Sequence, residues 1–170
     1  MDEGSARVAS PRVFFLLAGL QAGVAGALVM LLWLALASVW YRRSLWHIPN
    51  LLATTFHGEA ALRHRFSFST VSGIALHLLI YGALGAAFAL AVQDRWSPAR
   101  KVLLGIILAV AWYYISFHVL WNSVNPIVAL YSPDRPLLVG HIIYGGMIAR
   151  FPAYLRSLTH EFQPNSLTSS

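Results

Sequence analysis

Four long apolar stretches dominate the chain, and they lie at residues 13–40, 71–92, 102–121 and 137–154. A helix needs roughly 20 predominantly apolar residues to cross the hydrocarbon core of a bilayer, where every backbone polar group must be bonded within the protein. The pattern therefore predicts an all-α membrane protein with four transmembrane helices. Two polar ends, residues 1–12 and 156–170, flank a single transmembrane domain at 13–155.

The connections between these stretches are unequal. Residues 41–70 contain an apolar piece at 48–56, and residues 122–136 contain a shorter apolar insert at 127–131. Pieces of this length are too short to cross a bilayer and are typical of interfacial or re-entrant segments. We therefore expect short segments of this kind between spans 1 and 2 and between spans 3 and 4. The connection at 93–101 is brief and basic.

One order of residues occurs twice along the chain. A histidine, a tyrosine and a glycine open the second and fourth stretches, and each group follows a tryptophan, an asparagine next to a proline, and a short apolar insert. The two groups are His77, Tyr81 and Gly82, and His141, Tyr144 and Gly145. We interpret the order as a duplicated helical hairpin whose two halves have the same orientation in the membrane. Chance recurrence of short aromatic and small-residue patterns is the alternative.

The pattern as a whole resembles small four-span bacterial inner-membrane proteins of the YagU-like kind. The resemblance covers roughly residues 18–150. It implies the four-span architecture and a location in the bacterial inner membrane, and it implies no activity. The matching positions are the glycines of the first stretch, the insert at 49–53 and the two His-Tyr-Gly groups: Gly19, Gly23, Gly26, His77, Tyr81, Gly82, Gly140, His141, Tyr144 and Gly145.

Composition supports the membrane assignment and limits the chemistry. Hydrophobic residues make up 58% of the chain and charged residues only 11%, which excludes an ordinary soluble domain. The net charge of +6 comes from basic residues scattered between the spans, so we interpret them as topology signals and contacts with anionic lipids, not as a nucleic-acid surface. The chain has no cysteine, which excludes disulfides and thiolate ligands.

The distribution of basic residues predicts the orientation. Seven of the twelve basic residues lie at the two ends and in the second connection, and five lie in the longer first and third connections. Positive charge is enriched on the cytoplasmic side of membrane proteins, so we expect both termini in the cytoplasm.

Histidines and tyrosines inside the spans are the candidate site. If the helices alternate in direction, His77, His118 and His141 lie at one face of the membrane, one to two turns inside their helices. Strongly polar residues within a span usually face the bundle interior and have a partner there. Three tyrosines follow the same faces or lie one turn away, and they complete a predicted polar cluster: Tyr81, Tyr114 and Tyr144.

Three interpretations of this cluster remain open. In the first, the side chains form hydrogen bonds between helices that fix packing and register. In the second, His77 and His141 are axial ligands of a haem, or the cluster binds a metal ion. In the third, the histidines line a small transporter or channel, which would require oligomerisation. Catalysis is disfavoured because no intramembrane carboxylate is available to orient a histidine, and there is no Gly-x-Ser-x-Gly motif.

The sequence thus predicts a non-enzymatic structural or accessory membrane protein without a cofactor, with a small transporter and a haem or metal protein as alternatives. Its expected partners are membrane lipids, a second copy of the chain or a larger membrane complex. Small residues in the spans predict close helix packing, above all between spans 1 and 2, or else an interface with another subunit. The glycines concerned are Gly19, Gly23, Gly26, Gly82, Gly85 and Gly145.

Overall fold

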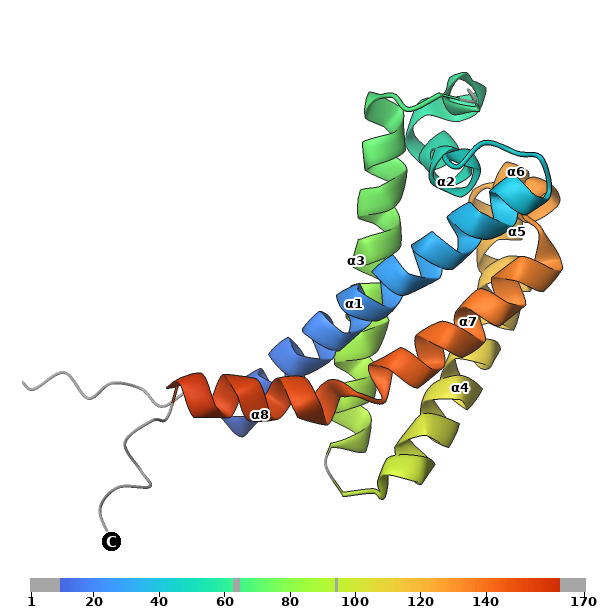
Figure 1. The fold of residues 1–170 in the computed structure, drawn as a ribbon. Helices are drawn as coiled ribbons and strands as arrows, with labels where there is room; N and C mark the ends of the chain where they lie inside the picture. Colours follow the sequence, from blue (N-terminus) through green and yellow to red (C-terminus); the bar gives the residue numbers. More distant parts are fainter. Residues whose placement is uncertain (1–9, 63–64, 94, 163–170) are drawn as a thin grey trace, which may run out of the picture.

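The computed structural model describes residues 10–62, 65–93 and 95–162, and in this part of the chain all regular secondary structure is helical, without strands (Figure 1). Residues 1–9 and 163–170 of the two predicted polar ends lie outside it. The helices in chain order are α1 (Pro11–Trp40), α2 (His47–His57), η1 (Gly58–Ala61), α3 (Phe68–Val92), α4 (Pro98–Ile115), η2 (Ser116–Leu120), α5 (Trp121–Val124), α6 (Pro126–Tyr131), α7 (Asp134–Ile148) and α8 (Phe151–Phe162).

Three helices are long and apolar enough to cross a membrane. They are α1, α3 and the continuous run Pro98–Val124, which consists of α4, the π-helical turn η2 and α5. Prolines occupy the first turns of α1 and α4, where a missing backbone N–H leaves no helical hydrogen bond unmade. The protein is therefore an integral membrane protein, as its first three apolar stretches predict.

The fourth apolar stretch, 137–154, is not one continuous helix, and Pro152 near its end is the residue expected to end or kink it. The structure divides it between α7, which ends at Ile148, and α8, which begins at Phe151. Pro152 is the physical reason, because a proline is tolerated in the first turn of a helix but not in its interior. With 15 residues α7 is roughly 22 Å long, whereas the hydrocarbon core is about 30 Å thick.

The long helices form a row, not a closed four-helix bundle. Helix α1 lies between α3 and α7, and α7 in turn packs against α4 (Figure 1). Helix α8 turns away from α7 and packs along the start of α1, where Phe14, Ala18 and Leu158 are buried together. This arrangement brings α8 to the end of the molecule at which α1 begins.

Glycines set the closest helix contacts. A Cβ atom added at Gly19 would lie 2.5 Å from the carbonyl oxygen of Gly85, and one added at Gly23 would lie 3.0 Å from the Cα atom of Gly82. Such separations leave no room for a side chain, so the backbones of α1 and α3 touch. Gly145 and Gly105 form a similar contact between α7 and α4, and Gly26 faces the Tyr144 ring.

The two predicted short segments are helices α2 and α6. All seven residues from Ile48 to Thr54 of α2 are buried, so this helix is packed into the bundle and does not lie on its surface. It contacts α3 so closely that a Cβ atom at Gly73 would clash with the carbonyl oxygen of Pro49. Helix α6 packs against α2 and, with α5, closes the same end of the molecule (Figure 1).

Candidate functional site

A buried cluster of two histidines and two tyrosines lies where α1, α3 and α7 meet. His77 and Tyr81 are one turn apart on α3, and His141 and Tyr144 are one turn apart on α7. His141 is fully buried, and the other three side chains are between 1% and 7% exposed. We call these four side chains the His–Tyr cluster.

His141 and Tyr144 of α7 both form hydrogen bonds to Tyr81 of α3. The Nδ1 atom of His141 lies 2.7 Å from the carbonyl oxygen of Leu137, so Nδ1 carries the proton and donates it. The Nε2 atom of His141 then accepts from the hydroxyl of Tyr81 at 2.8 Å. The hydroxyl of Tyr144 donates to the backbone carbonyl of Tyr81 at 2.5 Å. These bonds join α7 to α3 and fix one tautomer of His141.

His77 adds a link to the first helix. Its Nε2 atom donates to the carbonyl oxygen of Ala27 in α1 at 3.2 Å. The imidazole lies against the Tyr81 ring, with the ring centres 4.4 Å apart. Tyr81 in turn contacts the Tyr144 ring edge to face at 4.8 Å, a favoured aromatic geometry. The His–Tyr cluster therefore ties three helices together.

The remaining two predicted members lie elsewhere. His118 and Tyr114 stack on each other with ring centres 5.8 Å apart, and both are exposed on the outside of the bundle. The buried face of the helix contains Gly105, Ala109 and Tyr113, spaced four residues apart. Tyr114 comes one residue after this face and so lies about 100° around the helix. His118 is displaced in the same direction, one residue after the buried Phe117.

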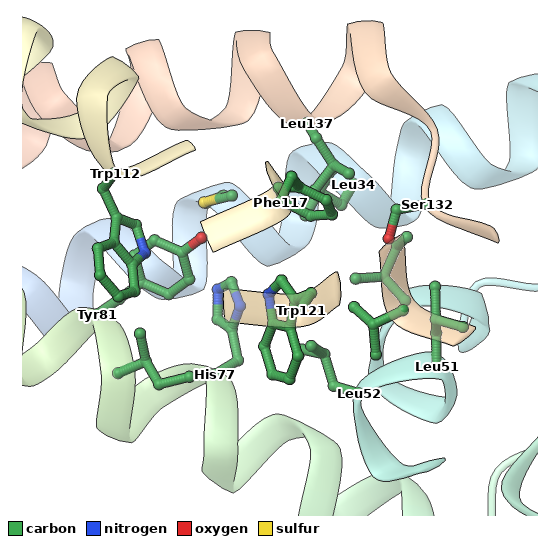
Figure 2. A pocket seen from close by; sticks show the side chains of 14 residues that line it. Leu34, Leu51, Leu52, His77, Tyr81, Trp112, Phe117, Trp121, Ser132 and Leu137 are labelled. Carbon is green, nitrogen blue, oxygen red and sulfur yellow. The ribbon is translucent and has the colours of Figure 1, made fainter. Parts of the chain in front are cut away.

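A small cavity adjoins the His–Tyr cluster. It has a volume of about 30 Å³, and its wall includes His77, Tyr81, Trp112 and Trp121 (Figure 2). Most other lining side chains are aliphatic residues of α1, α2 and α7. This volume suits one or two water molecules, whereas sites for organic ligands usually measure roughly 300–1,000 Å³. A haem would therefore not fit between the helices without a large rearrangement.

A second buried network of hydrogen bonds joins the short helices, and the sequence did not indicate it. The Thr70 hydroxyl donates to the side-chain oxygen of Asn50 at 2.6 Å, linking α3 to α2. The side-chain amide of Asn125, next to α6, donates to Thr54 at 2.7 Å and to Thr55 at 3.1 Å, both in α2. The repeated Asn and Pro pattern was the available signal, but it did not indicate that the two inserts would contact each other.

Lys101 is the other residue that the sequence did not single out. It stands in the basic second connection of the predicted topology, yet its side chain is only 5% exposed at the start of α4. Its ammonium group lies 5.8 Å from the ring centre of Phe151, the first residue of α8. A cation over an aromatic face is a stabilising contact, so Lys101 helps to hold the corner between α7 and α8.

Within the described residues, no three histidine or carboxylate side chains are grouped in a way that would hold a metal ion. No buried side-chain nitrogen or oxygen in that part of the chain lacks a hydrogen-bond partner. No protein-family model, curated protein or solved structure matches this chain.

Proposed function

We propose that this protein is a non-enzymatic structural or accessory component of a membrane, and that the His–Tyr cluster serves to hold its helices in register. The proposal rests on one observation, which is that the polar groups of the cluster form hydrogen bonds within the bundle. His77, Tyr81, His141 and Tyr144 each bond to another helix or to a neighbouring turn. Side chains committed in this way act as interhelical links, as expected for polar groups in lipid.

The proposed architecture has four crossings. Helix α7 supports it because it packs beside both α1 and α4 and leads the chain back to the end where α1 begins (Figure 1). A short helix crosses a membrane when the bilayer thins locally or when flanking residues reach the interface. Arg150, in the turn after α7, is exposed and suited to that role.

Labelling of single cysteines tests the crossings, since the natural chain contains no cysteine. Three exposed serines provide the positions: Ser97 before α4, Ser123 in α5 and Ser157 in α8. With four crossings, a membrane-impermeant maleimide modifies the Ser97→Cys and Ser157→Cys variants from one side and the Ser123→Cys variant from the other. Labelling of Ser97→Cys and Ser157→Cys from opposite sides would show that α7 does not cross.

The two halves are proposed to be similar hairpins. One close glycine contact in each half supports this, because a Cβ atom at Gly23 would lie 3.0 Å from the Cα atom of Gly82 in the first half and a Cβ atom at Gly145 would lie 2.6 Å from the carbonyl oxygen of Gly105 in the second. Gly82 and Gly145 each follow the tyrosine of their His-Tyr-Gly group. The YagU-like resemblance, a bacterial inner-membrane location and cytoplasmic termini belong to the same proposal.

A double-mutant cycle tests the role of the His–Tyr cluster. Tyr81→Phe and His141→Leu each remove one partner of the same hydrogen bond, and the double variant removes both. We expect a coupling of about 0.6–1.7 kcal/mol in the free energy of unfolding in mild detergent. Each variant should still insert into the membrane. A coupling near zero would contradict the packing role.

Four further measurements separate the alternatives. A haem protein would show a Soret absorption band, and a metal protein would show stoichiometric metal by elemental analysis. A transporter would move solutes across proteoliposomes, and His141→Leu would abolish that flux. An accessory component shows none of these properties, and after gentle extraction it migrates in a complex larger than its own 18.8 kDa.

A further inference from the structure

An outward-facing groove runs between the last turns of α1 and the first turns of α7. Its volume is about 380 Å³, within the range of typical ligand sites. One wall is a single face of α1 that includes Trp33, Leu36 and Trp40, and the other wall includes Arg135 and Val139 of α7. These helix ends meet on the side of the molecule opposite α8 (Figure 1).

The floor of the groove is fixed by polar and close-packed contacts. The indole N–H of Trp33 donates to the carbonyl oxygen of Pro136 at 2.8 Å. Below it, a Cβ atom at Gly140 would lie 3.1 Å from the Met30 side chain. The two helices are thus held together beneath the groove, so its shape does not depend on an occupant.

The exposed walls are apolar and aromatic. Trp40 is 85% exposed, and Leu36 and Val139 are also exposed. Tryptophan and tyrosine at the end of a membrane helix lie at the level of the lipid headgroups, while aliphatic side chains one turn deeper face acyl chains. The groove therefore presents to the bilayer a headgroup zone at Trp40 and Tyr41 and a hydrocarbon zone at Leu36 and Val139.

The charge at the mouth of the groove is positive. Arg135 lines the groove and is exposed. Arg43 lies at the same end of the molecule, where its guanidinium donates to the carbonyl oxygen of Tyr131 at 3.2 Å. The adjacent carboxylate, Asp134, lines a different hollow between η2 and α6. Among the side chains that the structure describes, no acidic one lines the groove itself.

We propose that this groove binds one anionic glycerophospholipid, with its phosphate at Arg135 and an acyl chain along Leu36 and Val139. Charge complementarity selects the anionic headgroup, and the apolar walls select a ligand with a hydrocarbon chain. The proposal requires only that the protein lies in a membrane. The lipid site is therefore independent of the proposed accessory role, and either one can be wrong without the other.

The test measures stabilisation by defined lipids. The full-length protein in a neutral detergent is titrated with phosphatidylglycerol or with phosphatidylcholine, and its thermal unfolding midpoint is followed. We expect phosphatidylglycerol to raise the midpoint more than phosphatidylcholine does. In the Arg135→Gln variant, half-maximal stabilisation should require about fivefold more phosphatidylglycerol. The Arg156→Gln variant, altered at an exposed residue of α8, is the matched control and should behave as the natural protein does.

Groove-filling variants distinguish a bound lipid from a diffuse surface attraction. Leu36→Trp fills the hydrocarbon zone from the α1 wall and Val139→Trp fills it from the α7 wall, and both variants keep Arg135. A variant is used in the test when its unfolding midpoint in phosphatidylcholine equals that of the natural protein. Both should lose the preference for phosphatidylglycerol. The groove site would be overturned if Arg135→Gln lost the preference for phosphatidylglycerol while both tryptophan variants kept it. It would also be overturned if Arg135→Gln and Arg156→Gln lost the preference equally. Stabilisation by glycerol 3-phosphate equal to that by phosphatidylglycerol would overturn the lipid assignment.

Discussion

Two adjacent glycines of α7 offer a sharp test of how the second pair of helices is packed. A Cβ atom at Gly145 would lie 2.6 Å from the carbonyl oxygen of Gly105 and 2.7 Å from the Cα atom of Ile106, both backbone atoms of α4. A Cβ atom at Gly146 would have no atom within 4 Å. Gly145→Ala and Gly146→Ala therefore make the same chemical change one residue apart, and only the first creates a clash.

The size of the effect follows from a comparison of the two variants. Replacing glycine with alanine inside a helix stabilises it by about 0.5–1 kcal/mol, and this gain applies to both positions and cancels in the comparison. Forcing an extra methyl group into a packed contact costs about 1–3 kcal/mol, because the α4 backbone must move. We therefore expect Gly145→Ala to be less stable than Gly146→Ala by about 1–3 kcal/mol.

The measurement is the free energy of unfolding of both variants in the same mild detergent, by titration with a denaturing detergent. Helix content should be unchanged in each folded variant, so that the difference reports helix packing and not helix formation. The reasoning about close backbone contact between α4 and α7 fails if the two alanine variants unfold with equal free energies, or if Gly146→Ala is the weaker one.

Two other substitutions test the contacts that the sequence did not reveal. Asn125→Ala removes two hydrogen bonds to α2 and should lower the free energy of unfolding by about 1–3 kcal/mol, whereas the exposed Asn122→Ala should change it by less than about 0.5 kcal/mol in the same assay. Lys101→Met keeps the apolar stem and removes the cation over Phe151, so it should destabilise the protein by about 0.5–2 kcal/mol. Limited proteolysis should then cleave α8 faster than in the Arg100→Met control, and unchanged cleavage would contradict this role.

The membrane helices were predictable because hydropathy reports the solvent of a helix directly. The expected stretches at 13–40, 71–92 and 102–121 fall inside α1, α3 and the run Pro98–Val124. The meeting of the histidine and tyrosine pairs of α3 and α7 also follows from sequence, since helices that alternate in direction bring their corresponding ends to one depth. For these features the period of the helix and the length of the apolar run carry enough information.

The break in the fourth apolar stretch and the orientation of His118 were harder to predict from the sequence, because both depend on local contacts. Hydropathy over 137–154 gives no sign of a break, and Pro152 predicts only that the helix ends or kinks, not that a separate helix α8 follows and packs against α1. The direction in which His118 points depends on which face of α4 meets α7. The contact between Gly105 and Gly145 decides that face. Nothing in the sequence around Gly105 identifies its partner helix.

Two kinds of interaction hold the helices of this bundle together. In lipid, apolar surface gains little by meeting other apolar surface, so association relies on close van der Waals packing and on hydrogen bonds. Glycine contacts supply the close packing within the pair α1 and α3 and within the pair α4 and α7. Helices α3 and α7 touch only slightly, yet the bonds from His141 and Tyr144 to Tyr81 connect them. Substitution of Gly145 should therefore loosen the pair α4 and α7, whereas substitution of His141 should loosen α7 from α3 while the contact of α7 with α1 remains. Distances between spin labels on α3 and α7, and between labels on α4 and α7, would separate these outcomes.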